Sequence, residues 1–228
     1  MLDHVFTDAI GALREVFEGA LLERQAFEER FQTDPLLGDT SWETTYGLPG
    51  EGDPPRVRAD VTLRWTTWSQ TMYRSWYLGE DIEGVPRIDA EIVFRLQRLD
   101  ESPDPACVLN ALPTESPPVG NDLLERGGPT LETNFDTDLS VAEHAIEVSY
   151  TGVYELHHEL LADGNLIDAH FGALGGWIAS TLVQYQTHQG NAHHCPKTIS
   201  TWRRRPRWVD RPRTRSPVMP SHSRKKRM

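Results

Sequence analysis

The chain lacks the features that define several large classes of protein. Two cysteines in 228 residues cannot build the disulfide framework of a small secreted scaffold. The longest strongly apolar stretch, residues 171–183, is shorter than the ~20 residues that cross a bilayer. The first nine residues hold two aspartates and no basic residue, unlike a secretory signal. We therefore expect no membrane partner, no secretion by a signal peptide, and a location in the cytoplasm or inside an assembled particle.

Lysine is missing from residues 1–195, which hold 33 acidic residues and 11 arginines for a net charge of −22. A GC-rich genome, which favours arginine codons, explains this without any function. A high-salt cell explains it too, because at about 1 M salt the Debye length falls to ~3 Å and the self-repulsion of an acidic surface is screened. A DNA mimic, which is also acidic, is the third explanation.

Catalytic motifs are missing as well. The chain has no G-x-S-x-G, no phosphate-cradling G-x-x-x-x-G-K-[ST] and no G-x-G-x-x-G. His158-Glu159 opens a zinc-protease pattern, but Ala162 stands where the second histidine would lie. The sequence predicts a protein without enzymatic activity and without a cofactor. An unrecognised hydrolase with a pair of carboxylates is the remaining enzymatic alternative.

Apolar residues at three- and four-residue steps predict two amphipathic helices. The first covers residues 3–31 and the second covers residues 166–186. Small residues recur along one flank of the second helix and make it unusually smooth. Because small residues let another backbone approach closely, we expect Gly172, Gly176 and Ser180 to lie in a subunit interface.

Alternation of apolar and polar residues predicts an antiparallel four-strand sheet with one face on the core. The expected strands are residues 57–65, 71–78, 88–96 and 145–156. Two stretches rich in proline and glycine, residues 32–56 and 100–130, are expected to be long loops. Together the helices and strands predict an α+β fold.

The charge reverses in the last part of the chain. Residues 196–228 hold 12 basic residues and one acidic residue, a net charge of +11. The sequence therefore divides into an acidic α+β body, residues 1–192, and a basic tail, residues 193–228, that prolines keep extended or disordered. The candidate binding residues of the tail are Arg203, Arg204, Arg205, Arg207, Arg211, Arg213, Arg215, Lys225, Lys226 and Arg227.

Three interpretations of the tail stay open. Its charges suit phosphate backbones, because binding them would release counterions. They also suit the acidic body of a neighbouring subunit. The third interpretation is that the tail is not native sequence, since the composition changes abruptly between Ala192 and Lys197.

A group of potential metal ligands precedes the tail. It consists of His188, His193, His194 and Cys195. Four ligands are sufficient in number for zinc, but three adjacent residues cannot easily reach one tetrahedral ion. A solvated linker is therefore the alternative to a metal site.

An aromatic set lies in and between the predicted strands. It consists of Trp65, Trp68, Tyr73, Trp76 and Tyr77. Such a set suits stacking on single-stranded nucleic acid. Few arginines accompany it within a strongly negative body, so we expect these residues to serve the core or a subunit interface.

The predicted order of elements resembles that of tail-terminator and head–tail connector proteins of tailed viruses. The resemblance rests on a long N-terminal helix (residues 2–31), an antiparallel sheet with long loops (residues 57–96) and a later helix. It implies a ring at the neck or tail of a virion, with a high-salt host and no catalytic residues. We therefore expect a structural assembly protein that forms a homo-oligomer and binds other assembly proteins. The alternative is a nucleic-acid-associated protein anchored by its basic tail.

Overall fold

The computed structural model describes residues 3–24, 29–50, 52, 54–136 and 141–189. The chain divides into two units, residues 1–195 and 196–228, and every described residue belongs to the first. Nearly all of the predicted basic tail therefore belongs to the second unit, and the whole tail lies outside the described residues.

One antiparallel sheet runs through the first unit, and the described residues contribute seven strands to it. Neighbouring strands follow the order β1-β3-β4-β5-β7-β6, and β2 also pairs with β3. The strands are β1 (Glu23–Arg24), β2 (Arg30–Thr33), β3 (Thr40–Gly47), β4 (Val57–Trp65), β5 (Arg87–Leu99), β6 (Glu125–Asp136) and β7 (Val141–Glu155).

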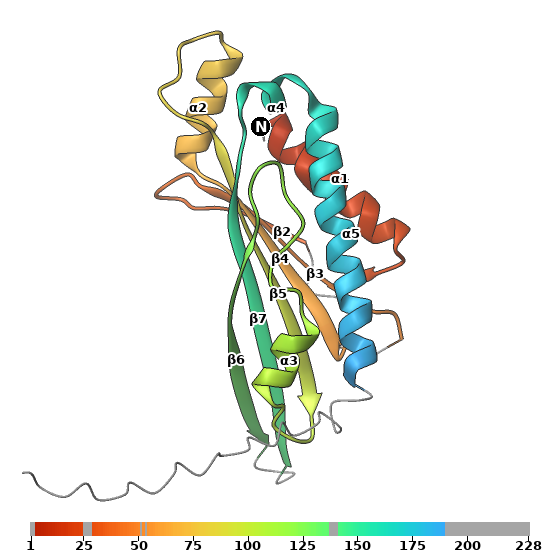
Figure 1. Ribbon diagram of the computed structural model, residues 1–228. Coiled ribbons are helices and arrows are strands. Elements are labelled where there is room, and N and C mark those ends of the chain that lie inside the picture. The colour runs from red at the N-terminus through yellow and green to blue at the C-terminus, as the bar shows by residue number, and fades with distance from the viewer. Residues whose placement is uncertain (1–2, 25–28, 51, 53, 137–140, 190–228) are drawn as a thin grey trace, which may run out of the picture. The chain divides into compact units, whose positions relative to one another are not determined.

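Five helices accompany the sheet within the described residues. They are α1 (His4–Gly19), α2 (Thr67–Tyr77), α3 (Pro105–Ala111), α4 (His158–Ala162) and α5 (Gly164–Gln189). Figure 1 shows α1 and α5 against the same face of the sheet. The helices α2 and α3 lie at opposite ends of β5, because one precedes this strand and the other follows it (Figure 1).

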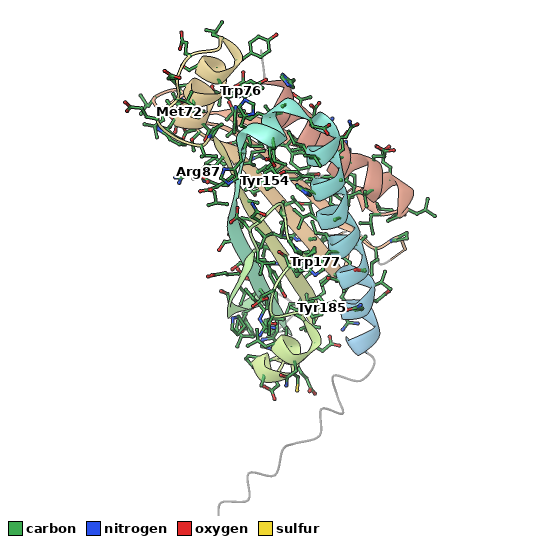
Figure 2. All side chains as sticks on the ribbon, turned by 45° about the horizontal axis from the view of Figure 1, so that its top comes forward. Met72, Trp76, Arg87, Tyr154, Trp177 and Tyr185 are labelled. Carbon is green, nitrogen blue, oxygen red and sulfur yellow. The ribbon has the colours of Figure 1, made fainter. Side chains whose placement is uncertain are left out.

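The core fills the space between the sheet and the two long helices. Under α1, Phe6 stacks on Trp65 of β4 with ring centroids 6.1 Å apart. Under α5, Trp177 meets Phe94 of β5 at 5.5 Å and Tyr150 of β7 at 5.0 Å. Figure 2 shows Trp177 and, further along α5, Tyr185. Side chains from strands far apart in sequence thus meet under α5.

The smooth flank of α5 serves the crossing of α1 and α5. A Cβ on Gly175 would lie 3.1 Å from Cβ of Val16 in α1, so a larger residue would push the helices apart. Gly172 lies on the same side, where a Cβ would meet Val16 at 3.9 Å. One reason for small residues in α5 is therefore a contact within the chain.

By length and composition, α5 would also be apolar enough to cross a membrane over Gly164–Gln186, and it is the one such helix among the described residues. Its inner side, which includes Phe171, Leu174, Ile178 and Leu182, is buried in the core. The core helix of a globular unit has the same composition.

Three predicted strands and one predicted helix are confirmed. Residues 57–65 and 88–96 lie in β4 and β5, residues 145–155 of the third predicted strand lie in β7, and residues 166–186 lie in α5. Most buried side chains of these strands are those on the predicted inner face, such as Val61 in β4, whereas Gln97 and Ala145 are buried outside it. The predicted fold as a whole is wrong, since the sheet has seven strands rather than four and the first helix is short.

The first helix ends at Gly19, so the predicted helix over residues 3–31 is wrong in its second half. Leu21 has φ 56°, in the left-handed region, and the amide of Leu22 donates to the carbonyl of Phe17 at 3.0 Å. This is a Schellman ending with leucine at the position where glycine is usual. Phe31, the last apolar residue of the predicted helix, lies in β2 instead.

Residues 71–78, predicted as a strand, fold as the second half of α2 and its C-cap. Met72 and Trp76 share one face of a strand, but residues four apart also share one face of a helix. The spacing of these apolar residues therefore does not distinguish a strand from a helix. The hydroxyl of Thr66 accepts from the amide of Ser69 at 3.2 Å and caps the helix. The segment 66–70, which lies between two of the predicted strands, is therefore the cap and the start of this helix.

Both predicted loops contain regular structure. Residues 32–56 include β3, whose Trp42 and Tyr46 are buried on the core side. Residues 100–130 include α3 and the beginning of β6. Asp104 caps α3 by accepting from the amide of Ala106 at 2.9 Å. In both cases the density of proline and glycine hid a short element between the turns.

Candidate interaction surface around α2

The helix α2 projects from the sheet between the end of β4 and the start of β5 (Figure 1). Its own buried residues are only Ser69 and Tyr73. Ser69 donates from its hydroxyl to the carbonyl of Arg87 at 2.8 Å, which joins the helix to β5. The helix is thus attached along one narrow side.

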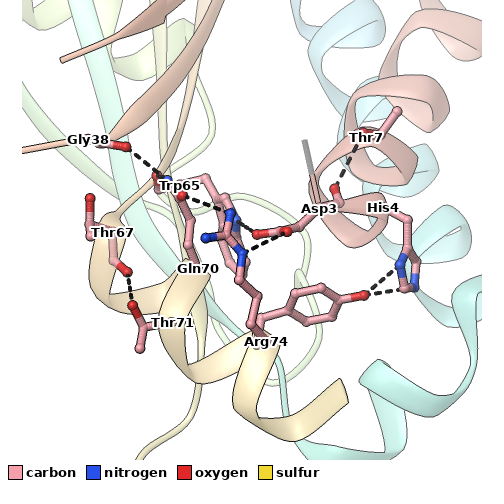
Figure 3. A network of polar contacts seen from close by, with 10 residues as sticks. Asp3, His4, Thr7, Gly38, Trp65, Thr67, Gln70, Thr71 and Arg74 are labelled. Atoms are coloured by element: carbon pink, nitrogen blue, oxygen red, sulfur yellow. Dashed lines mark hydrogen bonds and ion pairs between the residues drawn. The ribbon is translucent and has the colours of Figure 1, made fainter. Parts of the chain in front are cut away.

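A polar network joins α2 to the N-terminus of α1 (Figure 3). The carboxylate of Asp3 accepts from the indole of Trp65 at 2.9 Å and from Nε of Arg74 at 3.4 Å. The hydroxyl of Tyr73 lies 2.5 Å from Nδ1 of His4. Burial, helped by the charge of Asp3, raises the pKa of Tyr73 to about 12, so this hydroxyl keeps its proton at neutral pH.

The turn between β2 and β3 is bonded to the first residues of α2. Gln70 donates to the carbonyls of Gly38 and Trp65, at 3.1 Å each (Figure 3). The amide of Thr67 donates to the Asp39 carboxylate at 2.7 Å. Gly38 has φ +77°, and a Cβ there would lie 3.0 Å from the Thr67 hydroxyl, so this close approach favours glycine. The network holds the turn and α2 as one piece.

Large apolar side chains are exposed on this piece. We call them the α2 surface: Leu36, Leu37, Trp68, Tyr77 and Leu78, exposed by 92, 65, 46, 69 and 72%. The leucines at 36 and 37 stand on the turn, and the other three stand on α2 and its C-cap. Trp68 and Tyr77 are nine positions apart and so lie on opposite sides of the helix. The helix therefore carries exposed aromatic side chains away from the narrow side by which it is attached.

An open groove of about 660 Å³ lies between the segment after α2 and the start of α4. Its less exposed lining is apolar and forms the floor: Trp76, Ile82, Val85, Leu156 and Leu161. Figure 2 labels Trp76 beside Met72 at this end of the molecule. The ring of His158 meets Trp76 edge-on at 5.9 Å, and His157 lies 3.4 Å from the Glu155 carboxylate.

Three exposed carboxylates, those of Glu80, Asp81 and Glu83, form the rim of this groove. Among the residues that the structure describes, no ion pair joins any of them to a basic side chain. The groove thus combines an apolar floor with uncompensated negative charge. Such a lining suits an apolar ligand that carries positive charge.

The predicted aromatic set divides between two places. Trp65 and Tyr73 are buried in the core and the network, whereas Trp68 and Tyr77 are exposed on the α2 surface. Trp76 is half-buried in the groove. Sequence reasoning named these residues but placed Tyr73, Trp76 and Tyr77 on a strand, so it missed the groove. The helical spacing of Trp68, Met72 and Trp76 was the signal that could have found it.

The predicted metal ligands and tail residues are not tested. The side chain of His188 is not described, although its backbone belongs to α5, and His193, His194, Cys195 and the tail arginines and lysines lie outside the described residues. Among the described residues, no three histidine, cysteine, aspartate or glutamate side chains are grouped to hold a metal ion. The metal site stays a prediction.

The predicted interface residues of α5 have different surroundings. Gly172 faces α1 of the same chain, whereas Gly176 and Ser180 are exposed. A Cβ on Gly176 would meet no atom within 4 Å. An interface with another subunit at these positions stays a prediction, since the structure holds a single chain.

No family model matches this chain, and no curated protein or solved structure matches it either. A function can therefore be inferred only from the described residues, above all from those around α2.

Proposed function

We propose that this protein is a non-enzymatic assembly protein that forms a homo-oligomer through the α2 surface. The observation that carries the proposal is the exposure of Leu36, Trp68 and Leu78 on a piece that hydrogen bonds hold in place. Large apolar side chains that a single chain leaves exposed on one region of its surface mark an interaction site. A second subunit would cover the apolar side chains that this chain leaves exposed.

The more specific form of the proposal is a ring at the neck or tail of a virion with a high-salt host. A contact between two different surfaces of neighbouring copies is heterologous, and it gives a ring when the rotation closes. High salt would screen the repulsion between bodies that each carry a net charge of −22. The likeness to tail-terminator and connector proteins stays a prediction.

A nucleic-acid-associated protein is the second candidate. The observation that favours it is the net charge of +11 in residues 196–228. Such a protein would bind through the tail, and its affinity would fall steeply with salt because bound counterions are released. Deleting the tail would abolish this binding and leave the contacts of the body unchanged.

Molar mass measured by light scattering in about 2 M salt tests the proposal, because the repulsion between bodies is then screened. We expect a discrete multiple of the 25.9 kDa chain for the parent protein. The variant Leu36→Ser/Leu78→Ser should be monomeric. The control Leu131→Ser/Val183→Ser removes two apolar side chains that are exposed elsewhere, by 47 and 50%, and should keep the parent's mass. A parent protein that is monomeric at every concentration would contradict the proposal and leave nucleic-acid binding as the leading function.

A further inference from the structure

We propose that the groove beside α2 binds the basic tail of a second copy of this chain, through residues 202–208. This inference rests on the self-association proposed above and names the segment that makes one of its contacts. It adds to the α2 surface a second contact, in which a groove of one subunit receives a tail from the next.

The groove selects its ligand by two properties. Its floor offers Trp76, Ile82 and Leu156 to apolar or aromatic side chains. Its rim offers the carboxylates of Glu80, Asp81 and Glu83, which no described basic residue pairs with. Phosphate groups would be repelled here, so the rim disfavours nucleic acid. A peptide segment with both aromatic and basic residues matches the two properties together.

The tail contains a segment of this chemistry. Residues 202–208 read W-R-R-R-P-R-W, with four arginines between two tryptophans. Tryptophan and arginine are the residues that most often dominate binding at protein interfaces. The proline prevents a helix, so the segment enters the groove extended and spans roughly 23 Å at about 3.3 Å per residue.

The lengths and charges also fit a contact between copies. Residues 196–228 span up to about 110 Å when extended, which is enough to reach a neighbouring subunit. The tail carries +11 and the first 195 residues carry −22, so the tail of one copy is attracted to the body of the next. Tail and groove are different surfaces, so the contact is heterologous and is compatible with a ring.

A pair of charge-matched variants tests the inference in the full chain. The test variant is Glu80→Gln/Asp81→Asn/Glu83→Gln, and the control is Glu18→Gln/Asp100→Asn/Glu101→Gln. Both remove three exposed carboxylates of the same kinds, so their net charges are equal. In about 0.15 M salt, where surface charges still act over ~8 Å, we expect the test variant to self-associate at least about tenfold more weakly than the control.

A third variant and a peptide examine the tail itself. Trp202→Ala/Trp208→Ala, which leaves every charge in place, should weaken self-association as well. A synthetic peptide of residues 199–215, added in excess, should weaken the self-association of the parent chain, and it should have less effect when both tryptophans are replaced by alanine. The unfolding midpoint of each variant checks that the body remains folded.

The outcomes separate this inference from the proposed function. If the two charge variants associate equally, or if the peptide leaves the strength of self-association unchanged, the tail does not bind this groove, although self-association through the α2 surface stands. If the parent chain is monomeric at every concentration, both proposals fail.

Discussion

The helices α5 and α2 both carry large apolar side chains, but α5 buries most of them, whereas α2 leaves several exposed. Phe171, Ile178 and Leu182 of α5 are fully buried between α1 and the sheet. Trp68 and Tyr77 of α2 are about half exposed or more. The composition of α5 is explained by the fold of a single chain, whereas that of α2 is not. This difference locates the surface at which a partner is needed.

The two helices are also held by different forces. Apolar contacts hold α5, as in the edge-on packing of Phe171 against Tyr154 with ring centroids 5.0 Å apart. Hydrogen bonds hold much of α2, through Asp3, Gln70 and Ser69. Packing and hydrogen bonds respond differently to substitution and to pH, so the comparison can be tested.

The largest effect is expected in α5. The variant Phe171→Ala should lower the free energy of unfolding by about 3–5 kcal/mol, because it leaves a cavity under a fully buried ring. Val183→Ala, on the exposed side of the same helix, should change it by less than about 0.5 kcal/mol. Urea unfolding followed by circular dichroism measures both. Similar losses in the two variants would show that the stated core of α5 is wrong.

A smaller effect is expected where hydrogen bonds hold α2. Asp3→Ala leaves the buried indole N–H of Trp65 without its partner and should cost about 1–3 kcal/mol. Asp3→Asn keeps an acceptor for the indole and should cost less. Hydrogen exchange should accelerate in residues 67–77 of Asp3→Ala more than in α5. Uniform acceleration along the chain would contradict the local role of this network.

The surroundings of the two helices explain why the sequence predicts α5 well and α2 poorly. The apolar residues of α5 recur with the period of a helix because a single face of α5 meets the core. Their periodicity therefore identified the helix in the sequence. In α2, Tyr73 is the one large side chain that is buried, so no continuous stripe of apolar residues marks the core-facing side of the helix, and the short apolar pattern resembled a strand. The polar partners Asp3 and Gly38 are far away in the sequence, and only the fold brings them to α2.

The rest of the fold shows the same limits. Long strands with one buried face, such as β4 and β5, were predictable because their alternation is uninterrupted. The end of α1 was not, because a leucine occupies the left-handed position of its C-terminal turn in place of the usual glycine. The groove joins residues 76–85 to residues 156–161, and no local pattern links segments so far apart.

Alkaline pH should lower the free energy of unfolding, because buried tyrosines in both regions lose their protons. Burial raises the pKa of Tyr73 and of Tyr150 to about 12, and it also raises the pKa of Tyr185 in α5. The folded protein holds these protons more tightly than the unfolded chain does. Its full stability is therefore present below pH 10 and is lost as the pH rises from 10 to 12.

The loss should be on the order of 1–2 kcal/mol per tyrosine. Urea unfolding at pH 9 and at pH 11.5 measures it. The variant Tyr73→Phe should show a smaller difference between the two pH values than the parent does. An equal difference in the variant and the parent would show that Tyr73 does not contribute to the loss of stability at alkaline pH.

The smallest effect is expected on the α2 surface itself. Leu78→Ser should change the free energy of unfolding by less than about 0.5 kcal/mol at a concentration where light scattering reports a monomer, because this side chain is 72% exposed. The same substitution should weaken self-association. A large loss of stability in the monomer would mean that Leu78 serves the fold rather than a partner.

Hydrogen exchange of the parent protein before and after an about 100-fold dilution, in about 2 M salt, tests the central claim most directly. If the α2 surface is covered by a second subunit, residues 67–78 exchange more slowly in the concentrated sample, while the buried side of α5 exchanges equally in both. Equal exchange of residues 67–78 at the two concentrations, in a sample that light scattering shows to be oligomeric when concentrated, would contradict the account.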